Sequence, residues 1–245
     1  MTLDQPWKIA ALIGLLILLR IAWGVWAEAP SRKATLEVLD SLLIAFILVF
    51  VIIRPFVVQS FFIPSESMEP TLKPSDRILV NKFLYRLNPP QRGDVIVFDA
   101  PPQALGGGDE HKDYVKRLVG LPGDQIRVRR NEGVYVNGKL LLDAPGVPPP
   151  DYDWPLREDG RPAEPYRVPA RCYFVLGDNR NLSHDSHAWT DPATGRDEPE
   201  LAAGRVLGKA MVVFWPPRRL RLVSDHQQVF VPRGTEYAGA AAPGR

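Results

Sequence analysis

Cysteine is almost absent from the chain, which has only Cys172 among its 245 residues. A single cysteine excludes an intrachain disulfide and a zinc site built from several cysteines. Charge of one sign is also scarce, because 30 Lys and Arg residues face 28 Asp and Glu residues and leave a net charge of +2. Proteins that bind nucleic acid over a broad surface show a clustered basic excess, and the sequence contains no such cluster. We therefore expect no nucleic-acid partner.

Long apolar runs are confined to the first 60 residues. Residues 7–27 and 38–58 each have about the 20 residues that a helix needs to cross the hydrocarbon core of a bilayer. Arg20 and Arg54 lie toward the ends of these segments, where their side chains can extend toward lipid headgroups. We predict two transmembrane helices within residues 1–60. The first segment could instead be a cleaved signal peptide, and either could be a buried core helix.

The charges that flank the two segments predict their orientation. Arg32 and Lys33 lie in the short link between the segments. Positive residues concentrate on the cytoplasmic side of membrane helices, so this link is expected in the cytoplasm. Everything after Val58 would then lie on the extracytoplasmic side of the cytoplasmic membrane, with the lipid bilayer as a partner.

From residue 61 onward the sequence consists of short β-like runs separated by Pro, Gly, Asn and Asp. These runs, with no long amphipathic helix among them, predict an antiparallel barrel-like or sandwich domain over residues 61–223. Asn137-Gly138 is a tight-turn signal between two of them. The predicted strands are residues 77–80, 95–98, 114–119, 126–129, 134–136, 139–142, 173–176 and 210–215.

Two segments depart from this β pattern. Residues 144–169 hold many of the 25 prolines, and we interpret them as a surface insertion or small subdomain. Residues 224–245 are polar and then rich in Ala and Gly, so they are expected to form a disordered tail.

A serine segment follows the second apolar run closely. Ser65 and Ser67 lie between Pro64 and Pro70. Prolines stiffen the chain and bias the residues before them toward extended geometry. A stiff, exposed loop suits a nucleophile that has to be held in place, although an ordinary Ser/Pro turn would have the same composition.

A lysine lies inside one of the predicted strands. Because alternate side chains of a strand share a face, Lys116 should point the same way as Tyr114 and Leu118. Apolar surroundings disfavour the charged ammonium and lower its pKa, and only the neutral amine can accept a proton from a serine hydroxyl. The alternative is a solvated lysine on an edge strand.

Residues 177–187 combine turn formers with hydrogen-bonding side chains and allow other chemistry. A histidine base could come from His184 or His187 with Asp185, although residues so close in sequence rarely point at one another. A metal site could combine these three residues with His111. Cys172 could be a nucleophile, although no histidine lies near it in the sequence, and a small buried hydrophobic residue at the start of a strand is the alternative.

Taken together and in this order, four segments resemble those of the bacterial type I signal peptidases, or leader peptidases: residues 64–72, 92–98, 114–124 and 177–186. The resemblance extends from the second apolar segment to Trp215. It implies a mainly β fold, with an antiparallel β catalytic domain that carries a smaller inserted β region, after N-terminal transmembrane helices. It also implies a membrane-bound serine endopeptidase that removes N-terminal signal peptides from secreted preproteins with a Ser/Lys dyad.

The resemblance assigns roles to individual residues. Ser67 would be the nucleophile and Lys116 the general base. Ser65 would form the oxyanion hole with the Ser67 backbone N–H, Ser183 would hold the Lys116 amine, and Asp185 would occupy a supporting salt-bridge position. Shallow pockets that admit small side chains at positions −1 and −3 of a preprotein would be lined by Ile63, Met68, Leu72, Tyr114 and Val115.

The same resemblance implies no cofactor and no metal, and we expect a monomer. Two departures from the family pattern concern loops: His187 stands where the family usually has Arg, and Pro74-Ser75 replaces a turn that usually contains Gly. Three rival functions stay open: a histidine-dependent hydrolase, a silent membrane scaffold with a signal-peptide-binding groove, and a self-cleaving regulator with the same dyad.

Overall fold

The structure of the chain is a computed structural model that describes residues 6–26, 29–49, 58–106, 111–223 and 230–231. Residue contacts divide the chain into two compact units, Met1–Gln59 and Ser60–Arg245. The division falls beside the boundary between the apolar segments and the predicted β domain.

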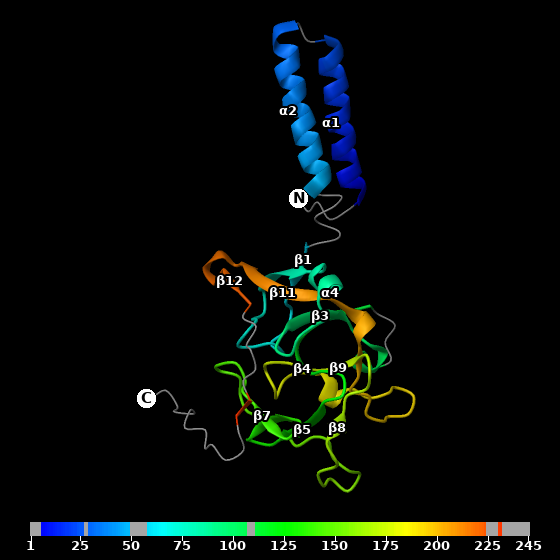
Figure 1. Cartoon of the computed structure of the whole chain (residues 1–245), viewed down its shortest axis with the longest axis vertical. Coiled ribbons are helices and arrows are strands. Elements are labelled where there is room, and N and C mark those ends of the chain that lie inside the picture. The colour runs from blue at the N-terminus through cyan, green and yellow to red at the C-terminus, as the bar shows by residue number, and fades with distance from the viewer. Residues whose placement is uncertain (1–5, 27–28, 50–57, 107–110, 224–229, 232–245) are drawn as a thin grey trace. The chain divides into compact units, whose positions relative to one another are not determined.

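The N-terminal unit is a pair of helices, α1 (Pro6–Trp26) and α2 (Ala29–Ile47), which lie side by side (Figure 1). Arg20 of α1 forms an ion pair with Asp40 of α2, whereas we had expected Arg20 to extend away from its helix. Among the described residues, none of the helices combines the length and the hydropathy required to cross a membrane.

The boundaries of these helices differ from the prediction. Arg32 and Lys33 belong to α2 rather than to a link, because the second helix begins at Ala29. The second apolar segment also does not continue as helix to its predicted end, since Val58 begins a strand. Arg54 lies outside the described residues.

The larger of two antiparallel sheets has the strand order β1-β2-β11-β3-β4-β9-β10, with β12 paired to β11. Hydrophobic side chains on β2, β3, β4 and β9 are buried. The strands are β1 (Val58–Phe62), β2 (Arg77–Asn81), β3 (Val95–Asp99), β4 (Asp113–Gly120), β9 (Cys172–Leu176), β10 (Leu201–Ala202), β11 (Val206–Trp215) and β12 (Arg221–Leu222). A short helix, α4 (Leu84–Leu87), follows β2.

The smaller sheet has the order β13-β7-β6-β5-β8 and lies at the opposite end of this unit from β1 and β12 (Figure 1). Its strands are β5 (Gln125–Arg129), β6 (Gly133–Val136), β7 (Lys139–Leu141), β8 (Tyr166–Arg167) and β13 (Phe230–Val231). Asn137 and Gly138, both at positive φ, form the predicted turn between β6 and β7. The sheet order confirms the expectation of a mainly antiparallel β body.

The predicted insertion packs on the smaller sheet. Trp154 forms a β-bridge with Val128 of β5, and β8 pairs with the start of the same strand. The predicted disordered tail is wrong for Phe230 and Val231, which pair with β7; the other tail residues, 224–229 and 232–245, lie outside the described residues.

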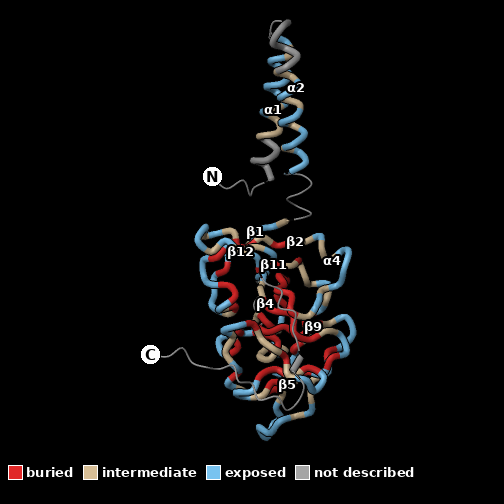
Figure 2. The backbone as a smooth tube through the Cα atoms, turned by 60° about the vertical axis from the view of Figure 1, so that its left-hand side comes forward, coloured by how far each residue is buried: buried red, intermediate tan, exposed pale blue. Residues whose placement is uncertain are grey.

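Buried residues form three clusters within the β unit, and the exposed backbone lies mainly in its outer loops (Figure 2). One cluster lies among β2, β3 and β11 and includes Met68 and Leu72. A second joins the smaller sheet to β9 through Phe174, and a third surrounds Phe98 and Trp189. Because β4 and β9 supply side chains to two of these clusters, their backbone is enclosed on both faces.

The turn before β2 needs a backbone conformation that is unusual for its sequence. Ser75 has a φ of 72°, in the left-handed region that glycine occupies most easily. The turn is nevertheless well bonded, because Ser75 N donates to Ile63 O at 2.9 Å and Arg219 binds the Asp76 carboxylate at 2.8 Å. Ser75 is therefore held in a strained conformation that glycine would adopt more easily.

We expect Ser75→Gly to stabilise the protein by about 0.5–1 kcal/mol, because the left-handed conformation then loses its Cβ clash. Denaturant unfolding of the full chain in detergent measures the difference. Ser75→Ala is the matched control, since it retains the Cβ atom and should give no gain. Equal stability of the glycine and alanine variants would show that this turn is not strained.

Candidate active site

One pocket of about 450 Å³ contains both predicted catalytic residues, Ser67 and Lys116. Its walls come from the end of β1, the loop that follows it, the start of β4 and the loop after β9. Ile63, Met68, Tyr114 and Val115 of the predicted substrate-binding set also line it, together with Phe61, Phe62, Pro64, Ser65, Lys112, Asp113, Leu182 and His184.

The serine loop is anchored at both of its ends. Ile63 and Met68 are buried in the core cluster of β2, β3 and β11, and Leu72 N donates to Met68 O at 2.8 Å. Between these anchors, Ser65 Oγ lies 3.2 Å from Ser67 Oγ, within hydrogen-bonding distance. Apolar side chains thus fix the loop while its two hydroxyls face the pocket.

Lys116 lies in the middle of β4, opposite Ile96 of β3, and its side chain is only 4% exposed. Burial, the largest influence, lowers the pKa of its amine from 10.5 to about 8, although the carboxylates of Asp185 and Asp178 act to raise it. Its Nζ lies 5.8 Å from the centre of the Tyr114 ring, on the same face of the strand. The neutral form of this amine is therefore a minority at pH 7 and predominates above about pH 8.

The loop after β9 holds the serine from behind through the backbone. Asn179 N donates to Ser67 O at 3.1 Å, and Asn179 Nδ2 donates to Glu66 O at 3.3 Å. A Cβ atom on Gly177 would lie 2.4 Å from Ser67 O and 2.2 Å from Ser183 Oγ. Only a residue without a side chain allows these three segments to approach so closely.

A buried ion pair connects this loop to β4. Arg117 donates to both carboxylate oxygens of Asp178, at 2.7 and 2.6 Å, and to Gly93 O at 2.7 Å. Sequence reasoning assigned no role to Arg117, Asp178 or Asn179, although two of them belong to the motif 177–180. The available signal was a charged residue within one apolar strand, Arg117, and another just after a second apolar strand, Asp178. A buried arginine needs a carboxylate partner, so these two charges were candidates for a pair.

Comparisons with known proteins agree with this geometry. The family model described as "Signal peptidase, peptidase S26" matches residues 35–215. The chain belongs to this signal peptidase family. The chain is 40% identical over 198 residues to a probable signal peptidase I-2 of Synechocystis sp., covering 81% of each chain. It is 34% identical to signal peptidase I of Pseudomonas aeruginosa, covering 75% of this chain and 74% of that one.

Membership in the signal peptidase family makes the chain a peptidase, and two predicted contacts of this peptidase need correction. Leu72 does not line the pocket, because it is fully buried in the core cluster beside Met68. Ser183 Oγ is buried but has no hydrogen-bond partner among the described residues, so it does not hold the Lys116 amine here. Its side chain packs against Gly177 instead.

Asp185 and His187 do contact each other, contrary to our expectation for residues so close in sequence. Asp185 precedes a 3-10 turn, Ser186–Ala188, and this turn brings His187 Nδ1 to 2.6 Å from its carboxylate. This is the predicted salt-bridge position. His187 does not line the pocket of the signal peptidase, whereas His184 does.

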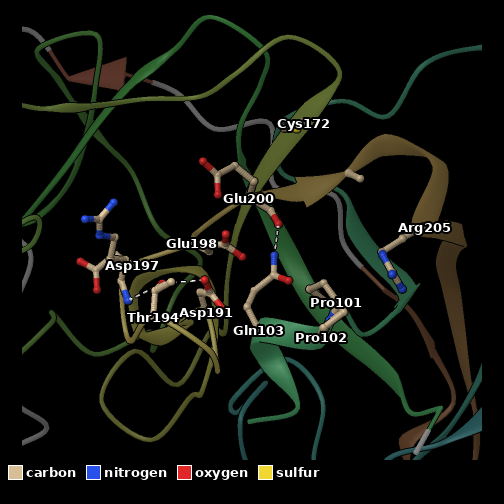
Figure 3. Close-up of a pocket in the computed structure, with 12 residues that line it drawn as sticks. Pro101, Pro102, Gln103, Cys172, Asp191, Thr194, Asp197, Glu198, Glu200 and Arg205 are labelled. Atoms are coloured by element: carbon tan, nitrogen blue, oxygen red, sulfur yellow. Dashed lines mark hydrogen bonds between the residues drawn. The ribbon is translucent and has the colours of Figure 1, made fainter. Parts of the chain in front are cut away.

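A second pocket of about 700 Å³ contains neither Ser67 nor Lys116 (Figure 3). Gln103 Nε2 donates to Glu200 O across one of its walls, at 2.9 Å, and Cys172 lies at its edge. Burial raises the pKa of the Cys172 thiol, which disfavours the thiolate nucleophile. No set of three or more metal-binding side chains occurs among the described residues, and His111 pairs with Asp99.

Gly177→Ala should disrupt the catalytic pocket, because the new methyl group has to displace Ser67 O and Ser183 Oγ. We expect cleavage of a preprotein to fall about a hundredfold, the usual effect of moving a reacting group by about 1 Å. The matched control is Gly204→Ala, since a Cβ there meets nothing within 4 Å. Full activity of the Gly177 variant would refute the close approach.

Proposed function

We propose that this signal peptidase is a membrane-anchored serine endopeptidase that removes N-terminal signal peptides with Ser67 and Lys116. The observation that carries the proposal is the shared pocket, which is lined by both Ser67 and a buried lysine whose pKa is lowered to about 8. Lysine is normally charged at neutral pH and cannot act as a base until it loses that charge.

The proposed reaction uses only groups of this pocket. Neutral Lys116 takes the Ser67 proton while Oγ attacks the scissile carbonyl, and the resulting oxyanion accepts hydrogen bonds from Ser65 Oγ and the Ser67 N–H. The Lys116 ammonium then protonates the departing amine and leaves an acyl-enzyme. Water, deprotonated by the same amine, hydrolyses this ester and restores Ser67.

In the described structure, Ser67 Oγ pairs with Ser65 Oγ rather than with the lysine. This arrangement fits a substrate-free enzyme, because catalytic hydrogen bonds are often long or misaligned before substrate binds and tighten in the complex. The Ser65 hydroxyl already lies beside the nucleophile, as an oxyanion donor must.

The pocket walls favour small apolar side chains in the substrate. Ile63, Met68, Tyr114 and Val115 surround the two catalytic groups and leave a limited volume. A preprotein segment that lies extended beside a strand would direct alternate side chains, at −1 and −3, toward these walls. The proposed partner is therefore a preprotein with small residues at both positions.

We assign membrane anchoring to the N-terminal helices and place the β unit on the extracytoplasmic side. Apolar side chains such as Leu18 and Ile44 are exposed on α1 and α2. The pairing of Arg20 with Asp40 neutralises two charges that would be unfavourable in lipid. Membrane attachment is also general in this family.

Burial of the Lys116 amine predicts a stability effect with a definite pH dependence. Below about pH 8 the native state holds a desolvated ammonium, so Lys116→Met should be more stable than the parent by about 3 kcal/mol at pH 7. The difference should shrink as pH rises from about 8 toward 10.5, because the native amine loses its proton before the unfolded one. Denaturant titrations between pH 6 and 10 measure it.

The control for this measurement is Lys139→Met, which removes an exposed lysine of β7 and should leave stability nearly unchanged at every pH. A Lys116→Met variant that is less stable than the parent at pH 7 would contradict the burial of a high-energy ammonium.

The test of function is cleavage of a purified preprotein by the full chain in detergent. Ser67→Ala and Lys116→Met should each reduce turnover about a thousandfold or more, and Ser65→Ala about a hundredfold. Lys139→Met should retain full turnover. The parent's rate should rise with pH through about 8, because the neutral amine is the active form.

Each rival makes a different forecast in this assay. A histidine-dependent hydrolase would lose all turnover when His184 and His187 are replaced together and would survive Lys116→Met. A silent scaffold would give no difference between the parent and Ser67→Ala. A self-cleaving regulator would cut its own chain and leave the supplied preprotein intact.

A further inference from the structure

The Pro-rich insertion reaches a residue close to the catalytic pocket. Tyr152, within residues 144–169, stacks on the His187 ring with centroids 4.1 Å apart and an interplanar angle of 13°. The Tyr152 hydroxyl is buried and has no hydrogen-bond partner among the described residues. The flat face of this ring, rather than its polar group, therefore makes the specific contact.

The stacked imidazole contacts the carboxylate of Asp185, which belongs to the loop after β9. His187 Nδ1 lies 2.6 Å from Asp185 Oδ1, and Gly177 N donates to Asp185 Oδ2 at 2.8 Å. Asp185 is fully buried. Burial alone would favour its protonated acid, but the contact with His187 holds the pKa of Asp185 below its usual value, so it carries a charge.

This charge acts on both members of the proposed dyad. Asp185 favours the ammonium form of Lys116, and it fixes Gly177, the residue against which Ser67 O packs. The imidazole of His187 offsets part of the field of this carboxylate through their contact, so the contact favours the neutral amine. An arginine at this position would carry a permanent positive charge.

We propose that Tyr152 and His187 are positioning residues for the Ser67/Lys116 pair: the tyrosine ring holds the imidazole against Asp185, and the imidazole sets the field at the amine. The inference rests on the proposed Ser/Lys function. Tyr152 does not itself line the pocket and acts through His187. Through this contact the insertion supports the two catalytic residues.

Other charged groups near Tyr152, His187 and Asp185 also contribute to the electrostatic field at the Lys116 amine. The Tyr152 phenol stays neutral, because burial raises its pKa. The remaining charged groups that interact with Asp185 or Tyr152 are Lys116 of β4, Arg180 of the loop after β9, Asp143 between β7 and the insertion, and Asp151 of the insertion. None of these groups is altered in the variants below, so a shift between variants reports the imidazole.

The experiment measures kcat/KM for preprotein cleavage by the full chain in detergent, from pH 6 to 10. His187→Gln removes the imidazole that offsets Asp185, and the acidic limb of the pH profile should move up by about half to one pH unit, which lowers activity on that limb about three- to tenfold. His187→Arg supplies a permanent charge and should move the limb below that of the glutamine variant.

Two tyrosine variants test the stack. Tyr152→Leu removes the flat ring and should shift the limb in the same direction as His187→Gln, whereas Tyr152→Phe keeps the ring and should retain the parent's limb. Tyr135→Leu is the control, because this ring lies on β6 of the smaller sheet and contacts Arg129 instead. Thermal unfolding of every variant separates loss of folding from a change in pH profile.

The inference is overturned if the glutamine, arginine and leucine variants all fold and keep the parent's acidic limb, even if their rates fall uniformly. That result differs from failure of the proposed function, in which Ser67→Ala or Lys116→Met would themselves retain turnover. A limb that moves equally for Tyr152→Phe and Tyr152→Leu would also overturn it, because the hydroxyl rather than the stack would then matter.

Discussion

The removal of the Lys116 amine from water is the constraint on which this molecule depends. An ammonium in the interior of a sheet destabilises the fold, and the same penalty keeps part of the amine in the neutral form that can accept a proton. The fold meets this requirement by enclosing β4 between β3 and β9. Directly beside Lys116, the buried Arg117 is fully compensated by Asp178, so one of the two adjacent charges is neutralised and the other is not.

Backbone contacts add to the apolar anchors that hold Ser67, the proposed nucleophile, in place. The carbonyl of Ser67 accepts from Asn179 N and lies against Gly177, so the loop after β9 supports the serine loop along its main chain. Such support leaves the Ser67 hydroxyl free to react. It also makes the packing at Gly177 sensitive to a single added methyl group, because main-chain atoms cannot move aside as a flexible side chain can.

The smaller sheet and its insertion contribute no residue to the pocket of Ser67 and Lys116. Here the stack of Tyr152 on His187 connects them to Asp185 and thereby to the loop behind the serine. In this chain the partner of Asp185 is the imidazole of His187. His187 thus lies next to a carboxylate that acts on the Lys116 amine.

The sequence by itself determined the alternation of the β strands and the turn at Asn137-Gly138, because these follow from local periodicity and turn chemistry. The place of Ser67 and Lys116 in the motifs of one family came from the resemblance of those motifs. The roles of the two residues stay predictions. Only the tertiary structure decided that Leu72 belongs to the core, that Ser183 has no partner among the described residues, and that His187 reaches Asp185. The stack with Tyr152 depends on segments 35 residues apart meeting in space, which no local pattern can encode.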